Sequence, residues 1–135
     1  MENQHTCKAT AIFCFDFRFA RRFYEFLESM YPGSYDPISA AGAVKSLLAD
    51  GKTDNFLLNQ VGLSASLHKT KAIVLIQHED CGAYGGSKAF ANSEAEIAFQ
   101  KEELQKAEDF LKRYHPNHLI RKFYFTLSGE VVSVQ

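Results

Sequence analysis

One stretch of the chain, residues 72–86, strongly limits the folds that the sequence can adopt. It contains the apolar run Ile73-Val74-Leu75-Ile76, which has the length and β-branched character of a buried strand. The run ends at the polar residues His78-Glu79-Asp80-Cys81, and a glycine-rich turn follows. A buried strand that ends in a histidine and a cysteine, with two residues between them, looks like half of a metal site. The other half must then come from elsewhere in the chain.

The first apolar segment, residues 9–15, supplies a matching set of polar side chains at its end. Cys14, Asp16 and Arg18 alternate there with the phenylalanines at positions 13, 15, 17 and 19. In an extended backbone this period of two places the polar groups on one side and the phenylalanines on the other. We therefore expect a thiol, a carboxylate and a guanidinium on one face of a strand end.

The rest of the pattern alternates helices with strands. We expect strands at 9–15, 35–39, 71–77, 119–127 and 131–134, and helices at 19–30, 40–50, 55–68 and 94–114. Ser39 is expected to cap the second helix, Gly51 to close it, Thr53-Asp54 to start the third, and a capping box from Ser93 to Glu96 to start the fourth. This order predicts one α/β domain over residues 1–135, with a mainly parallel sheet of about four strands, an antiparallel edge strand and flanking helices.

The expected sheet topology also predicts where a site would lie. Right-handed crossovers bring the carboxyl ends of parallel strands to one edge of the sheet, where α/β proteins commonly bind ligands. If the strands at 9–15 and 71–77 are neighbours, Cys14 and His78 emerge together at this edge. Cys81 lies three residues after His78 and is therefore close to both. Two thiolates and an imidazole suit tetrahedral zinc, and a free fourth position is typical of catalytic zinc sites.

Two short motifs in this set resemble those of the beta-class carbonic anhydrases. The family's Cys-x-Asp-x-Arg signature stands here as residues 14–18, and its His-x-x-Cys-Gly signature as residues 78–82. Ala41-Gly42, between them, resembles part of a third family segment. The resemblance implies the fold of that family, a Zn²⁺ cofactor held by Cys14, His78 and Cys81, and reversible hydration of carbon dioxide to bicarbonate. It also implies a homodimer or a higher homo-oligomer.

The resemblance further implies roles for Asp16 and Arg18 as a catalytic dyad. Zinc lowers the pKa of bound water towards neutrality, which gives a hydroxide that can attack carbon dioxide. Asp16 would accept a hydrogen bond from that hydroxide, and Arg18 would keep Asp16 ionised and away from the metal by a bidentate pair. If the pair breaks, Asp16 can itself become the fourth ligand, as in the closed state of the family.

Other interpretations stay open at the level of sequence. A related zinc hydrolase would use the same site on carbonyl sulfide or carbon disulfide, and a non-catalytic protein would use zinc only for binding or stability. The residues themselves also allow buried inert thiols or a disulfide between Cys14 and Cys81, and a structural ion pair between Asp16 and Arg18. The width of the pocket beside Phe15 and Phe17 separates a catalytic site from a blocked one.

Composition narrows the partners and the compartment. The net charge of −1 gives no general attraction to nucleic acid or to an anionic membrane, and no apolar run approaches the length of a membrane span. The polar N-terminus lacks the features of a signal peptide, and three cysteines do not suggest a disulfide framework, so we expect a cytoplasmic protein. Cys7 is interpreted as a packed or exposed thiol, and no partner is evident for His5, His68, His115 or His118.

Overall fold

The computed structural model describes residues 5–49 and 55–135, and its central feature is a mixed β-sheet. In the described part of the chain the sheet has 5 strands in the order β2-β1-β3-β4-β5. The first four are parallel, and β5 pairs antiparallel with β4 at one edge. The strands are β1 (Ala9–Phe13), β2 (Tyr35–Ser39), β3 (Ala72–His78), β4 (Leu119–Phe125) and β5 (Val131–Val134). The predicted α/β class, with a parallel sheet and an antiparallel edge strand, is confirmed.

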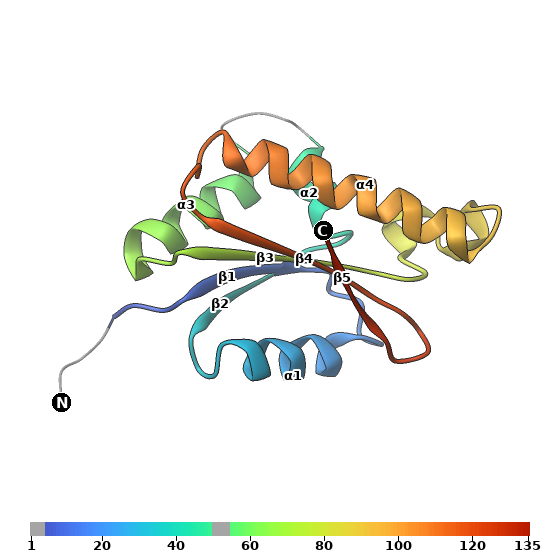
Figure 1. Cartoon of the computed structure of the whole chain (residues 1–135), viewed down its shortest axis with the longest axis horizontal. Helices are drawn as coiled ribbons and strands as arrows, with labels where there is room; N and C mark the ends of the chain where they lie inside the picture. Colours follow the sequence, from blue (N-terminus) through green and yellow to red (C-terminus); the bar gives the residue numbers. More distant parts are fainter. Residues whose placement is uncertain (1–4, 50–54) are drawn as a thin grey trace.

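Helices cover both faces of the sheet (Figure 1). Helix α1 (Ala20–Met30) lies alone on one face, while α2 (Val44–Leu48), α3 (Phe56–His68) and the long α4 (Ser93–Lys112) lie on the other. Two short 3₁₀ turns, η1 (Gly82–Tyr84) and η2 (Ser87–Ala89), connect β3 to α4. None of the helices in the described ranges has the length and apolar character needed to cross a bilayer.

Because both faces of the sheet are covered, its central strand is buried throughout and is apolar from Ala72 to Ile76. Every residue of β3 is buried, as expected for a parallel strand between two layers of helices. The core on the α1 face is largely aromatic and includes Phe13, Phe23 and Phe125. The core on the opposite face is aliphatic and packs Ile12 and Leu75 against the three other helices. The packed sheet therefore fixes the position of the loops that follow β1 and β3.

The expected continuation of the first strand beyond Phe13 is wrong. The side chain of Asp16 turns the backbone, since its Oδ1 accepts the N–H of Arg18 at 2.9 Å and its carbonyl oxygen accepts the N–H of Phe19 at 3.1 Å. Such Asx-type hydrogen bonds compete with the sheet ladder and end a strand. Consequently Phe15 and Phe17 do not share a buried face with Phe13, but are 68% and 86% exposed.

Two of the expected helix starts also differ. Helix α2 begins after Ala43, which has a φ of 48° and makes no side-chain cap, whereas Ser39 is the last residue of β2. Helix α3 is capped by Asn55, whose side chain accepts the N–H of Leu58 at 2.7 Å. Gly51, Thr53 and Asp54 lie outside the described residues.

The capping box predicted for the fourth helix is wrong as well. Asn92 caps α4 by accepting the N–H of Ala95 at 2.8 Å, and Ser93 is already the first helical residue. Glu96 is free to act elsewhere, and its carboxylate binds the loop after β3. The helix ends at Lys112, two residues before the expected Tyr114.

Candidate metal centre

The pairing of β1 with β3 brings the two halves of the expected metal site together. The strands are parallel, with Ile12 opposite Leu75, so Cys14 and His78 leave the sheet at the same edge. Cys81 lies three residues after the end of β3 and immediately before η1. The donor atoms of Cys14, His78 and Cys81 lie within 4.8 Å of one another, and all three residues are buried.

The imidazole of His78 is held in one orientation. Its Nδ1 lies 2.7 Å from the backbone carbonyl oxygen of Glu79, to which a protonated Nδ1 donates. This bond leaves Nε2 with a lone pair, and within the described residues Nε2 is a buried polar atom without a hydrogen-bond partner. Phe19 packs against the ring at a centroid distance of 4.4 Å. An oriented, unpaired ring nitrogen of this kind is what metal-binding histidines present.

The two thiols beside His78 affect each other's pKa. Their interaction lowers the pKa of Cys14 and raises that of Cys81. The backbone of Gly42 and Asp16 also favours the Cys14 thiolate. All three cysteines of the chain are free, so a Cys14–Cys81 disulfide is absent. One thiolate therefore forms readily in this pocket before any cation neutralises the second.

The donor set fits zinc. Tetrahedral zinc with bonds of about 2.3 Å to sulfur and about 2.0–2.1 Å to nitrogen separates its ligands by roughly 3.5–3.8 Å. Donors that lie within 4.8 Å of one another need only a small contraction to reach that arrangement. The unpaired Nε2 of His78 would gain a partner in the same step.

Asp16 and Arg18 form a close ion pair at the edge of this triad. The Nε of Arg18 lies 3.2 Å from each carboxylate oxygen of Asp16, and its Nη2 lies 2.7 Å from Oδ2. Hydrogen bonds from Arg18 lower the pKa of Asp16 and keep it ionised. The same Oδ2 lies 3.8 Å from Nε2 of His78, so the carboxylate faces the place where the donors converge.

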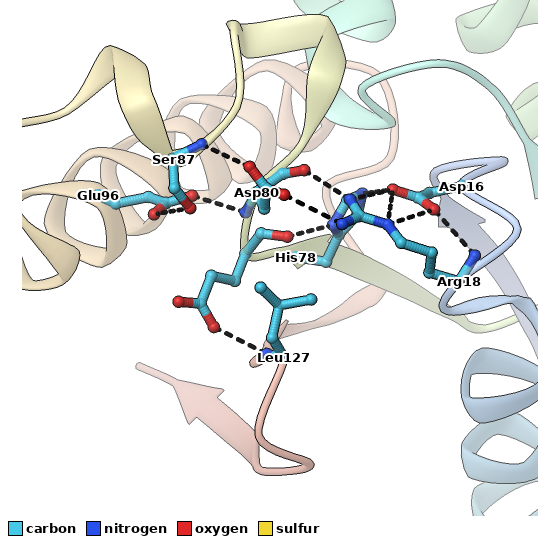
Figure 2. A network of polar contacts seen from close by, with 8 residues as sticks. Asp16, Arg18, His78, Asp80, Ser87, Glu96 and Leu127 are labelled. Atoms are coloured by element: carbon cyan, nitrogen blue, oxygen red, sulfur yellow. Dashed lines mark hydrogen bonds and ion pairs between the residues drawn. The ribbon is translucent and has the colours of Figure 1, made fainter.

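A second carboxylate anchors Arg18 from the β3 side (Figure 2). The Nη1 of Arg18 lies 3.0 Å from Oδ2 of Asp80, and its Nη2 donates to the Asp80 carbonyl oxygen at 2.8 Å. Asp80 is itself fixed, because its Oδ1 accepts the N–H of Ser87 and its own N–H binds Glu96, each at 2.7 Å. A hydrogen-bond chain therefore runs from α4 through the loop after β3 to the Asp16 carboxylate.

The sequence patterns identified one end of this series of hydrogen bonds, at Asp16 and Arg18, and missed the other end, at Glu96. Asp80 supports both the turn, by accepting the N–H of Ser87, and the guanidinium of Arg18. Glu96 was interpreted as a cap because of its position near a helix start, and no local pattern distinguishes a carboxylate that points to a distant loop. Glu96 is nevertheless 1% exposed, a degree of burial that is rare for an acidic residue without partners.

A cavity of about 800 Å³ opens in front of the dyad. Its wall combines polar groups of the site with apolar side chains, and its lining includes Cys14, Phe15, Asp16, Phe17, Arg18, Ala41, Asp80, Ala83 and Lys88. Phe15 and Phe17 stand at its rim and are mostly exposed to solvent. Their rings thus do not fill the pocket, and a small molecule has access to the dyad.

Comparison with known sequences decides the family. The profile of a family described as "Putative carbonic anhydrase" matches residues 4–135, nearly the whole chain. The chain belongs to this family. An uncharacterized protein of Rickettsia conorii is 29% identical to this carbonic anhydrase family member over 132 residues, which cover 91% of this chain and 69% of the relative.

Solved structures show the same fold. The beta-carbonic anhydrase CafA of Aspergillus fumigatus superposes with a TM-score of 0.69 over 98% of this chain and 77% of the fungal one, at 14% identity. A tetrameric beta-carbonic anhydrase of Sordaria macrospora gives a TM-score of 0.68 at 15% identity, over 97% of this chain and 81% of the other. Family and fold together support a carbonic anhydrase-type enzyme, and the Cys14–His78–Cys81 triad offers it a metal site.

Proposed function

We propose that the protein is a zinc enzyme that reversibly hydrates carbon dioxide to bicarbonate. Cys14, His78 and Cys81 hold the zinc ion in this proposal, and Asp16 and Arg18 are the catalytic dyad. The observation that carries it is the unpaired, buried Nε2 of His78, which faces two thiols and lies 3.8 Å from a carboxylate that Arg18 holds in place. A structural zinc site needs the three donors but has no use for an oriented carboxylate beside them.

Each side chain has a distinct part in the reaction. Zinc, when bound, supplies a Lewis acid that lowers the pKa of a coordinated water to near neutrality. Asp16 stays ionised and accepts a hydrogen bond from the attacking water, which orients the oxygen lone pair towards carbon dioxide. Arg18 supports this orientation through its contacts of 2.7–3.2 Å with the carboxylate. While these contacts persist, Asp16 cannot turn onto the metal.

The cavity suits both the substrate and the product. Ala41, Ala83 and the aromatic rings at the rim offer carbon dioxide an apolar surface. Arg18 and Lys88 place positive charge on the same wall, which favours the bicarbonate anion. Lys88 lies at the rim, so substitution there should change the affinity for bicarbonate more than the chemical step.

The test joins metal analysis to a carbon dioxide hydration assay. Purified protein should contain zinc and catalyse hydration. Cys14→Ser should lose the activity together with the zinc of this site, while Asp16→Asn should keep that zinc and lose the activity. Cys7→Ser is the matched control, because it removes a thiol outside the site and should hydrate carbon dioxide at the wild-type rate. Bound zinc without hydration at neutral to alkaline pH would refute the carbonic anhydrase proposal. Turnover of carbonyl sulfide by that inactive protein would identify the related hydrolase instead.

We also propose that the enzyme is a homodimer or a higher homo-oligomer. The large exposed rings of Phe15 and Phe17 lie beside the site, and the Sordaria macrospora relatives are tetrameric. Light scattering after size exclusion should give a mass above that of one chain, and Phe17→Ser should lower it. Phe56→Ser is the control, because Phe56 is also exposed, at 72%, but lies at the start of α3. A wild-type monomer would contradict the proposal.

We further propose that the protein works in the cytoplasm. Its three free cysteines are consistent with that reducing compartment.

A further inference from the structure

A second group of metal-binding side chains lies at the opposite end of the sheet. Cys7 precedes β1, Asp36 is the second residue of β2, and His68 is the last residue of α3. Asp36 lies level with Thr10, near the start of β1, whereas the triad lies beyond the end of that strand. One donor atom from each of Cys7, Asp36 and His68 lies within 4.8 Å of the other two. The function proposed above uses none of these residues.

The contacts within this group set the direction of each donor. Nδ1 of His68 lies 2.6 Å from Oδ2 of Asp36, and Ser64 donates its hydroxyl to the same oxygen at 2.6 Å. On the other side of the ring, Nε2 of His68 lies 3.2 Å from Nε2 of His5. The carboxylate and both nitrogens of His68 are thus held by neighbours, so the donors are ordered before any ion binds.

The thiol of Cys7 completes a set that has the chemistry of a zinc site. Its sulfur makes a long contact of 3.7 Å to the carbonyl oxygen of Ala9, which a better partner can displace. Burial and the nearby Asp36 carboxylate raise the pKa of Cys7, so without a cation it stays a neutral thiol beside the negative charge of Asp36. A divalent cation would neutralise this charge and take up the thiolate, imidazole and carboxylate that zinc prefers.

We propose that Cys7, Asp36 and His68 bind a second divalent transition-metal ion of the zinc class, with His5 as a positioning residue behind the His68 ring. In this arrangement the ligand nitrogen is the Nδ1 that already faces Asp36, and His5 accepts a hydrogen bond from Nε2–H. The side chains of His68 and Asp36 are 30% and 27% exposed, so an ion can enter from solvent. Bound there, it would tie the segment before β1 to β2 and to the end of α3.

The proposal is independent of the catalytic function and can be tested separately from it. Full-length protein without a histidine tag is made metal-free and titrated with Zn²⁺ in competition with a chromophoric chelator. We expect two equivalents in the wild type and one in Cys7→Ser, whose carbon dioxide hydration stays unchanged. His5→Ala should retain the second equivalent with an affinity about 10- to 100-fold lower, as for other groups that orient a metal-binding histidine. His115→Gln, a matched control outside both sites, should keep two.

Cobalt provides a readout specific to Cys7. In the variant Cys14→Ser/Cys81→Ser, Cys7 is the only cysteine left, so any thiolate-to-cobalt charge-transfer band must come from it. We expect such a band with one equivalent of Co²⁺. The band should be lost when the substitution Cys7→Ser is introduced into the same variant. A single equivalent of zinc in the wild type, unchanged in Cys7→Ser, would overturn the second site even if the double variant fails to fold. Loss of metal in Cys7→Ser but not in Cys14→Ser/Cys81→Ser would instead overturn the catalytic site and leave this one.

Discussion

The contact between Arg18 and Asp80 leads to a specific kinetic prediction. Asp80→Asn would remove one of the two carboxylates that hold the guanidinium, while the Asp80 carbonyl contact and the Asp16 pair remain. Asparagine is the right replacement because residue 80 has a φ of 60°, a conformation that asparagine adopts more readily than alanine. Its side-chain oxygen can still accept the N–H of Ser87. The change therefore removes charge with little effect on the loop.

The structure limits the size of the effect. The Arg18 and Asp80 side chains are 37% and 36% exposed, and ion pairs this accessible contribute about 0.2–1 kcal/mol. If the whole contribution reaches the oriented Asp16 carboxylate, kcat falls by about 1.5- to 5-fold, since about 1.4 kcal/mol corresponds to a factor of ten. At high ionic strength the screening length falls to a few ångströms, so salt weakens the interaction between exposed charges. The deficit of the variant should therefore shrink as salt is added.

Stopped-flow hydration with a pH indicator, from low to high salt, measures both effects. Zinc content should stay at the wild-type level, because Asp80 contributes no donor to the triad. Glu79→Gln is the matched control: it removes the same charge one residue away, from a carboxylate that accepts the N–H of Leu127 instead of binding Arg18. A variant with wild-type kcat at low salt, or an equal loss in Glu79→Gln, would refute the idea that Asp80 positions Arg18.

Three other outcomes test the packing and the charges. Phe23→Ala should lower the free energy of unfolding by about 3–5 kcal/mol in urea, because the fully buried ring contacts Phe13 and Phe125, and a loss below about 1 kcal/mol would contradict this. Gly86→Ala and Gly33→Ala should each cost about 1–2 kcal/mol through their positive φ of 76° and 62°. Only Gly86→Ala should also slow hydration, since its Cβ would lie 2.9 Å from Oδ1 of Asp80, whereas position 33 is open. Stability should fall below about pH 4, because hydrogen bonds from Ser87 and Arg18 lower the pKa of Asp80 in the folded state. A carboxyl whose folded pKa lies below its unfolded value of about 3.9 stabilises the protein above that value, and this contribution is lost as the pH falls. Urea midpoints from pH 5 to 3 should drop less in Asp80→Asn.

The parts of the fold that follow from periodic burial could be predicted from the sequence. The apolar run at Ile73 predicted a central strand, and the apolar segment before Cys14 predicted another, because both depend on covered faces of the sheet. From these two strands the meeting of Cys14 with His78 follows geometrically. The parallel strands and the antiparallel edge could be predicted from the order of elements along the chain, whereas the spatial order β2-β1-β3-β4-β5 comes from the structure.

The parts that depend on side-chain hydrogen bonds could not. Asp16 ends β1 with its own carboxylate, and Asn92 outcompetes Ser93 as the cap of α4. Asn92 and Ser93 are similar polar residues in adjacent positions, and their energies as caps differ by less than a local pattern can resolve. The pairing of His5 with His68 joins residues 63 positions apart, so no spacing within the sequence points to it.

The arrangement of β1 next to β3 has a consequence for how the protein assembles. Arg18 and Asp80 are 62 residues apart, and they meet only after the whole intervening segment has been closed into a loop. Long loops are closed late and slowly compared with local helices. The triad can therefore gain metal affinity only when the central pair of strands has docked, and metal uptake during refolding should follow sheet formation. Release of the ion should likewise require the two strands to separate, which makes its dissociation rate a measure of how often the centre of the sheet opens.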